Sequence, residues 1–340
     1  MEACRTDRSE KPFDSAVIWR PALDILMARG FSDPMKNSMR PISEVIQAAG
    51  QGDRIALAKL LSRLEREGPP VVGNSQELLA PAKSAFRIGI TGPPGAGKST
   101  LISKMIGGFR ERGKTVAVMA VDPSSPFTQG AILGDRIRYS DHVLDAGVFI
   151  RSLGSRGSLG GLSASAWLMV RAFDHAGFDV VLLETVGVGQ TELEIMNVAD
   201  HVSVVLTPES GDGIQGMKAG LMEISDLFLV NKADRPGADV FAREIEAALE
   251  LDPRTMSEKP PKVMKLSALT GDGVDAFLEE LESRLQQKAT WLPKRADPKR
   301  LHAEAKAMLM IEAERRASLA ASQIQTPEML GKLFRGISET

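Results

Sequence analysis

The hydrophobic positions of the chain form short apolar runs that are separated by segments with helical spacing. Seven such runs lie at residues 86–91, 115–121, 147–152, 178–185, 201–207, 226–231 and 262–267. Several of them are almost continuously apolar, which is typical of strands that are covered on both faces. Because helical patterns lie between the runs, we predict an α/β fold with a mostly parallel central sheet and helices on both of its faces.

The residues before the first run predict two helices. Residues 42–66 are interrupted at Gly50-Gln51-Gly52, and Asp53 is a suitable N-cap for the second helix. That helix has an apolar face with the spacing i, i+3, i+4 and i+7, formed by Leu57, Leu60, Leu61 and Leu64. A connector that contains prolines and glycines, residues 67–76, leads towards the first strand.

The residues after the last run predict a further helix over 298–322, in which Met308–Ile311 are consecutive apolar residues. Packing on the main domain and contact with a partner protein explain that apolar stretch equally well. The pattern divides the chain into four parts: an N-terminal extension that we expect to be disordered or briefly helical (1–41), a helical segment with a linker (42–85), the α/β domain (86–290) and a C-terminal helical extension (291–340).

The first apolar run leads directly into a phosphate-binding motif. Residues 90–105, ITGPPGAGKSTLISKM, fit the pattern G-x-x-x-x-G-K-[ST] in the order strand, loop and helix that this motif requires. Glycines allow backbone N–H groups to approach a phosphate that a side chain would block. Lys98 would place its charge on the β/γ oxygens, and the Ser99 hydroxyl would ligate Mg²⁺. The predicted phosphate-binding residues are Gly92, Pro93, Pro94, Gly95, Ala96, Gly97, Lys98, Ser99 and Thr100.

A second motif, Asn231-Lys232-Ala233-Asp234, follows another apolar run and predicts which base the nucleotide carries. Asn231 can hydrogen-bond the purine edge, and the Lys232 stem can lie over the ring. The Asp234 carboxylate can accept two hydrogen bonds from guanine, whereas adenine would leave it unpaired. Downstream, Ser267-Ala268-Leu269 brings the Ala268 N–H within reach of the guanine oxygen. We therefore predict that GTP and GDP are the ligands.

Acidic residues follow other predicted strands. Asp122 comes directly after the run 115–121, Asp135 lies 13 residues further on, and Glu184 lies at the end of the run 178–185. The carboxyl ends of parallel strands form the ligand-binding edge of such sheets, so these carboxylates can hold Mg²⁺ there. The predicted metal ligands are Ser99, Asp122, Asp135 and Glu184.

The residue that would position the attacking water is absent from its usual place. Ras-type GTPases carry a glutamine directly after D-T-A-G, whereas Val188 follows Glu184-Thr185-Val186-Gly187 here. Valine cannot orient water, so Asp122, Asp135, Gln190 or a group from a partner must do so, and we expect slow unassisted hydrolysis. The predicted catalytic residues are Lys98, Asp122, Asp135, Glu184 and Gln190.

Composition and charge bear on the partners and on the compartment that we expect for this protein. The net charge is −2 and no apolar run approaches the ~18 residues of a membrane span, so we expect no nucleic-acid partner and no membrane. The single cysteine, Cys4, excludes an internal disulfide and a cysteine-based zinc site. Charged residues interrupt the N-terminal segment where a signal peptide needs an apolar core. We therefore predict a cytoplasmic protein.

Several longer blocks of the sequence share their pattern with one family. GITGPPGAGKSTLI, AVDPSSPFTQGAILGD, FIRSLGSRGSLGGLS, VLLETVGVGQTELEI, GDGIQGMKAGLMEI and VNKAD together resemble the MeaB/ArgK/MMAA family of G proteins. The resemblance implies a P-loop GTPase that serves as a chaperone for an adenosylcobalamin-dependent acyl-CoA mutase, most often methylmalonyl-CoA mutase. It also implies gating of cofactor loading, protection or reactivation of the mutase, and a homodimer for which the C-terminal extension would be a candidate arm.

The same resemblance implies three switch segments. Asp122 and Asp135 belong to the first, and residues 184–190 belong to the second. Residues 208–220, PESGDGIQGMKAG, are similar to a third switch. The residues that would link the nucleotide state to the mutase contact are Asp212, Gln215 and Lys218. Spacing alone instead favours an ordinary loop with a glycine turn in that segment.

Three other functions fit parts of the sequence. A kinase or ATPase linked to lysine, arginine and ornithine transport would share the phosphate loop, but the guanine-selective motif and the lack of an export signal argue against it. A nickel-inserting GTPase usually carries clustered His or Cys ligands, whereas the histidines are scattered at His142, His175, His201 and His302. A switch that binds GTP without hydrolysing it stays open, as does the choice among methylmalonyl-, isobutyryl- and hydroxyisobutyryl-CoA mutases.

Overall fold

The computed structural model describes residues 41–73, 75–122, 139–154, 159–185, 196–209, 222–251 and 261–322. The chain divides into two compact units, residues 40–312 and residues 1–39 together with 313–340. All functional residues discussed below lie in the first unit. The predicted N-terminal extension falls outside the described residues except for Pro41, and the predicted four-part division of the chain stays a prediction.

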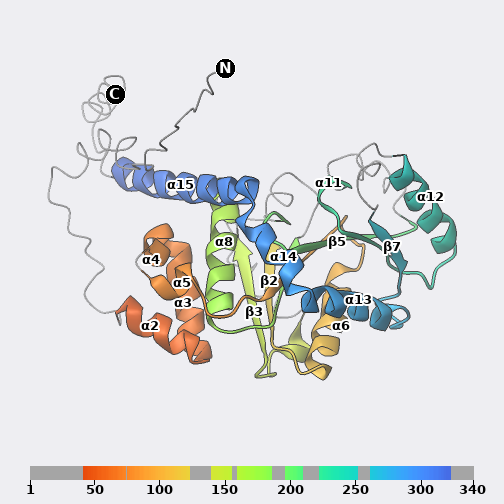
Figure 1. The fold of residues 1–340 in the computed structure, drawn as a ribbon, viewed down its shortest axis with the longest axis horizontal. Helices are drawn as coiled ribbons and strands as arrows, with labels where there is room; N and C mark the ends of the chain where they lie inside the picture. Colours follow the sequence, from red (N-terminus) through yellow and green to blue (C-terminus); the bar gives the residue numbers. More distant parts are fainter. Residues whose placement is uncertain are drawn as a thin grey trace, which may run out of the picture. The chain divides into compact units, whose positions relative to one another are not determined.

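All seven predicted strands are present and form one sheet (Figure 1). They are β1 (Phe86–Thr91), β2 (Val116–Asp122), β3 (Val148–Gly154), β4 (Val180–Thr185), β5 (His201–Leu206), β6 (Leu227–Val230) and β7 (Lys262–Lys265). Their order across the sheet is β3-β2-β4-β1-β5-β6-β7, and every neighbouring pair is parallel. The predicted fold class is thereby confirmed.

Helices connect and flank the strands. They are α2 (Ile42–Gly50), α3 (Arg54–Glu67), α4 (Pro69–Gly73), α5 (Gln76–Leu79), α6 (Lys98–Glu111), α8 (Leu159–His175), α11 (Met222–Ile224), α12 (Ala238–Glu250), α13 (Val274–Gln286), α14 (Lys288–Trp291) and α15 (Pro298–Ala321), with short 3₁₀ turns η1 (Ser140–His142) and η4 (Pro293–Ala296). Asp53 caps α3, because its carboxylate accepts from Ile55 N at 2.8 Å and Ala56 N at 3.0 Å. No helix in the described ranges is long and apolar enough to cross a bilayer.

The sheet is covered by helices on both faces, and the period-two alternation of strand side chains divides them between two cores. In β2, Val116 and Val118 belong to one core, which α6 and α13 complete. Ala117 and Met119 belong to the other, to which α3, α8 and α12 contribute. Figure 1 shows α6 and α13 side by side, in agreement with the Arg112–Glu282 contact of 3.4 Å between them. The predicted leucine face of α3 is buried in the second core.

A buried cluster of charged residues holds the segment after α14 against the amino ends of β1 and β5. Arg87 pairs with Asp174 at 2.6 Å, and Arg295 reaches the same carboxylate at 3.3 Å. Arg295 Nε donates to Asp200 at 2.9 Å, and Arg300 lies 3.3 Å from that carboxylate. The side chains of Asp174 and Asp200 are 2% and 0% exposed, so each arginine contact compensates a charge that water does not reach.

The apolar stretch of α15 has two sides. Met308 and Ile311 pack against the core that contains α3 and α8, which confirms the packing alternative for these two residues. Leu309 and Met310 are 53% and 49% exposed. Half of the stretch is thus partly buried against the core, and the other half is exposed.

Candidate functional site

The phosphate-binding motif lies where the sequence predicts it, between β1 and α6. β1 ends at Thr91, and α6 begins at Lys98, so the intervening loop opens at the carboxyl edge of the sheet. Thr185, the last residue of β4, donates its hydroxyl to Thr91 Oγ1 at 3.0 Å and ties the ends of these neighbouring strands together. The loop therefore begins on a fixed base in the middle of the sheet.

Three glycines of this loop have left-handed backbone angles. Gly92, Gly95 and Gly97 have φ values of 144°, 77° and 84°, which favour glycine. A Cβ at Gly92 would collide with Val205 O of β5, and a Cβ at Gly97 would collide with the Asn231 amide, whereas nothing lies near Gly95. Sequence analysis explained the glycines by the approach of a phosphate. Gly92 and Gly97 have the additional reason that neighbouring protein atoms leave no room.

The lysine of the motif is folded back onto its own loop. Lys98 is buried, and its Nζ donates to Gly92 O at 2.8 Å and to Pro93 O at 3.0 Å. Its positive charge is thus held within the loop formed by residues 92–97. The predicted contact of Lys98 with β/γ-phosphate oxygens stays a prediction.

Glu184 connects the loop to the neighbouring strand. It lies in β4, is 2% exposed, and its Oε1 accepts from Ser99 Oγ at 2.6 Å. Its Oε2 accepts from the hydroxyl of the fully buried Tyr139, which sequence analysis did not single out. The carboxylate therefore has a hydroxyl donor on each oxygen, and of the predicted metal ligands the structure brings Ser99 and Glu184 together.

The other acidic candidates are only partly described. We expected Asp122 beside the phosphate loop if its strand were close to β1. In the sheet, β4 lies between β2 and β1, and Ala120 of β2 pairs with Glu184 of β4. Asp122 therefore ends a strand that is not next to β1, the strand from which the phosphate loop starts. The side chain of Asp122 is outside the description, as are the whole residues Asp135, Gln190, Asp212, Gln215 and Lys218.

Asn231 joins three loops of the site. It follows β6, and its Nδ2 donates to Ala96 O of the phosphate loop at 2.7 Å. Its Oδ1 accepts from Ala268 N at 2.9 Å. Sequence analysis assigned Asn231 to the purine edge and Ala268 N–H to the guanine oxygen. Those roles stay predictions, and the structure adds that the two groups bond each other and support the phosphate loop.

Lys232 and Asp234 surround the predicted base position. Lys232 has φ of 58°, a left-handed angle that is uncommon for a residue with a side chain. Its Nζ donates to Glu209 at 3.3 Å, a contact that sequence analysis did not anticipate. A hydrogen bond from the Ser267 hydroxyl holds the pKa of the exposed Asp234 carboxyl below its usual value. Leu269 is 78% exposed.

The residues at the carboxyl edge fit a magnesium ion. Ser99 and Glu184 offer a hydroxyl and a carboxylate oxygen 2.6 Å apart, and Mg²⁺ prefers such hard oxygen donors. Mg²⁺ is typically held by one or two protein oxygens together with phosphates and water. No group of three or more His, Cys, Asp or Glu side chains within the described ranges is placed to hold a metal by itself.

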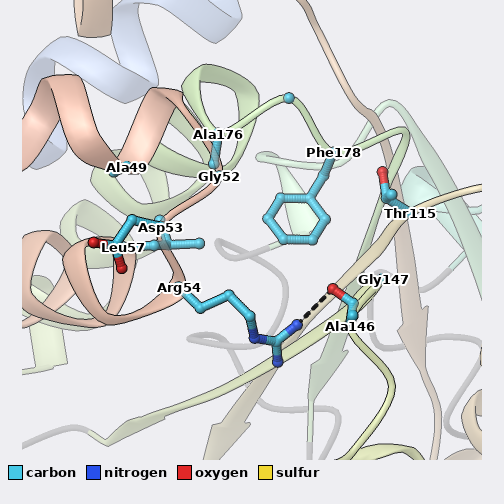
Figure 2. A pocket seen from close by; sticks show the side chains of 11 residues that line it. Ala49, Gly52, Asp53, Arg54, Leu57, Thr115, Ala146, Gly147, Ala176 and Phe178 are labelled. Atoms are coloured by element: carbon cyan, nitrogen blue, oxygen red, sulfur yellow. Dashed lines mark hydrogen bonds between the residues drawn. The ribbon is translucent and has the colours of Figure 1, made fainter.

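A separate pocket lies at the opposite edge of the sheet (Figure 2). Thr115, Gly147 and Phe178 line it, and each shortly precedes a strand, so the pocket lies at the amino ends of β2, β3 and β4. Arg54 crosses its rim and donates to Ala146 O at 2.7 Å. Its cavity volume of about 160 Å³ is below the ~300 Å³ at which ligand pockets begin. It is therefore not the nucleotide site.

Comparison with known proteins agrees with this geometry. A family model described as "Methylmalonyl Co-A mutase-associated GTPase MeaB" matches residues 57–322. A putative GTPase of Pyrococcus horikoshii is 47% identical over 247 residues, which cover 72% of this chain and 78% of that protein. GTPase ArgK of Escherichia coli is 36% identical over 277 residues, which cover 75% of this chain and 84% of that protein.

A solved structure has the same architecture. It is described as a LAO/AO transport system kinase, has a TM-score of 0.59 and 27% sequence identity, and the match covers 88% of this chain and 91% of that one.

Proposed function

The chain belongs to the family of methylmalonyl-CoA mutase-associated GTPases described as MeaB, and we propose that it binds an adenosylcobalamin-dependent acyl-CoA mutase and couples GTP hydrolysis to the state of that enzyme. It is a P-loop GTPase that binds GTP and GDP. In the proposed function, GTP hydrolysis gates the loading of the cofactor and protects or reactivates the mutase. Methylmalonyl-CoA mutase is the proposed partner, because the family description names it.

Hydrolysis is proposed to use the residues at the carboxyl edge of the sheet. Backbone N–H groups of residues 92–97 and the Lys98 ammonium bind the phosphates, and the Asp234 carboxylate, which the Ser267 hydroxyl hydrogen-bonds, selects guanine. Ser99 and Glu184 would hold Mg²⁺, which supplies a charge that neutralises the β- and γ-phosphate oxygens. Asp122, Asp135 and Gln190 remain the candidates for further metal and water contacts.

Assembly and regulation extend this proposal. We propose a homodimer in the cytoplasm, and residues 208–220 as the segment that carries the nucleotide state to the mutase through Asp212, Gln215 and Lys218. One contact of the described residues supports this route. Glu209, at the start of that segment, accepts from Lys232 of the base-binding motif at 3.3 Å.

The observation that carries the mutase assignment is the family match over residues 57–322, and partner-stimulated turnover tests it. Purified protein would be mixed with methylmalonyl-CoA mutase, and binding would be followed by size-exclusion chromatography with GTP or GDP present. Because no glutamine occupies the usual water-orienting position, GTP turnover should rise at least ~10-fold in the complex. A mutase that binds but leaves turnover unchanged contradicts the proposed coupling, and a mutase that does not bind contradicts the partner.

Nucleotide preference tests the rival function. A kinase or ATPase role is the rival proposal, because one structural relative is described as a LAO/AO transport system kinase. Calorimetric titration with GDP and ADP under the same conditions separates the two roles. We expect GDP to bind far more tightly, because ADP would leave the Asp234 carboxylate without its donors. Equal affinity for the two nucleotides would favour the kinase or ATPase.

A further inference from the structure

Tyr139 is the single tyrosine of the chain and is fully buried. It lies between β2 and β3, directly before the 3₁₀ turn η1. A phenol that is removed from water usually needs a hydrogen-bond partner, and the hydroxyl of Tyr139 donates to Glu184 Oε2. A chain segment that is distant in sequence thus reaches the carboxylate that faces the phosphate loop.

The carboxylate of Glu184 is held from two sides. Ser99 of the phosphate loop donates to Oε1 at 2.6 Å, and Tyr139 donates to Oε2. Two donors on different oxygens set the orientation of the carboxylate plane, and Glu184 is itself buried at 2% exposure. Hydrogen bonds of this kind, from a second residue to a metal-binding carboxylate, orient the ligand and strengthen metal binding.

The segment that carries Tyr139 has other anchors. His142 Nε2 and Ser103 Oγ of α6 are 3.0 Å apart, and Arg110 Nε of α6 pairs with Asp145 at 2.9 Å. These contacts hold residues 139–145 on α6 without involving Glu184. The segment is therefore attached to α6 independently of the contact between the phenol hydroxyl and Glu184.

We propose that Tyr139 is a positioning residue for Mg²⁺: its hydroxyl fixes one oxygen of Glu184 so that the other faces Ser99, where the metal binds. This inference rests on the proposed magnesium site. It assigns an influence on metal affinity, which acts through Glu184, to a residue outside the recognised nucleotide motifs.

The test compares Tyr139→Phe, which removes only the hydroxyl, with the wild type and with Ser103→Ala. Binding of N-methylanthraniloyl-GDP would be titrated with Mg²⁺ after removal of divalent ions. Tyr139→Phe should raise the half-saturating Mg²⁺ concentration about 10-fold or more. Affinity for the labelled GDP without Mg²⁺ should stay unchanged, because the proposed effect of the hydroxyl acts through the metal ligand Glu184. Ser103→Ala, which breaks the anchor to His142 but leaves Glu184 intact, should keep wild-type values in both measurements.

A second measurement keeps the wild-type fold. Because the chain has one tyrosine, labelling with 3-fluorotyrosine gives a single ¹⁹F resonance. In the GDP complex, Mg²⁺ should shift this resonance, and Glu184→Gln should abolish the shift. If wild-type GDP binding is insensitive to Mg²⁺, the proposed metal site fails and this inference fails with it. If binding depends on Mg²⁺ but Tyr139→Phe keeps the wild-type midpoint and the resonance does not move, the metal site stands and the role of Tyr139 is refuted.

Discussion

Replacing Asn231 with alanine tests whether one buried side chain holds three loops of the nucleotide site together. The change removes the 2.7 Å bond to Ala96 O and the 2.9 Å bond from Ala268 N. Ala96 and Ala268 are 1% and 2% exposed, so water reaches the two backbone groups poorly. An unsatisfied buried group costs about 1–3 kcal/mol, and the free energy of unfolding should therefore fall by about 2–6 kcal/mol.

Urea denaturation of the nucleotide-free protein, followed by circular dichroism, measures this loss. Asn197 is exposed and offers the matched control, since Asn197→Ala should change stability by no more than about 0.5 kcal/mol. Asn231→Asp keeps the acceptor for Ala268 N–H but places a carboxylate against Ala96 O, so it should also destabilise. If Asn231→Ala lost less than about 1 kcal/mol, the bridge would be wrong and Asn231 would serve the base alone.

Three further changes test other parts of the site and the core. Asp234→Asn should weaken GTP binding roughly 10-fold or more and favour xanthosine triphosphate, because the amide donates where the carboxylate accepted; unchanged GTP affinity in calorimetry would show that Asp234 does not face the base. Gly92→Ala should abolish GDP binding or folding, because its Cβ would collide with Val205 O. Gly95 has open space around it, so Gly95→Ala should lower the free energy of unfolding by only about 1–2 kcal/mol, owing to its backbone angle. Similar losses of stability and of GDP binding in the two variants would contradict this reasoning. Burial, with Arg284 and Lys294 nearby, lowers the pKa of His201 from 6.5 to about 3. Below pH 6.5 the unfolded chain therefore binds a proton that the native protein does not, and the free energy of unfolding should fall by up to ~1.4 kcal/mol per pH unit. Burial raises the pKa of Asp226, and this group opposes the trend. His201→Gln should remove the histidine part of the pH dependence between about pH 7 and about pH 5. If the denaturation midpoints of the wild type and of His201→Gln changed equally with pH, this explanation would be refuted.

The strands were predictable because most of them are dense apolar runs, and the predicted and observed ranges of β1 coincide at residues 86–91. The order of the strands was not, since nothing in the runs says that β4 lies between β2 and β1. That order places Glu184 on the strand next to the phosphate loop, where it contacts Ser99. Local pattern thus identified the elements, and long-range pairing determined their neighbours.

The nucleotide motifs were predictable for the same local reason, because glycines, Lys98 and Ser99 must follow one another in a short loop. Tyr139 was not, since it is a single aromatic residue among polar neighbours and its partner Glu184 is 45 positions away. The bridge formed by Asn231 was also hidden, because the motif names a base contact and the structure adds two backbone contacts. Supporting residues of this kind carry no fixed spacing.

The buried charge cluster limits where this protein can be shortened. Arg295 and Arg300 lie beyond residue 290, whereas the carboxylates that they neutralise, Asp174 and Asp200, lie 95 to 121 positions earlier. A fragment that stops after α13 would keep two sequestered negative charges and lose most of their counterions, at a cost of several kcal/mol. That loss is a large share of the total stability of a typical domain. The shortest fragment worth expressing therefore extends past the first turn of α15, although every strand and every nucleotide motif ends well before it.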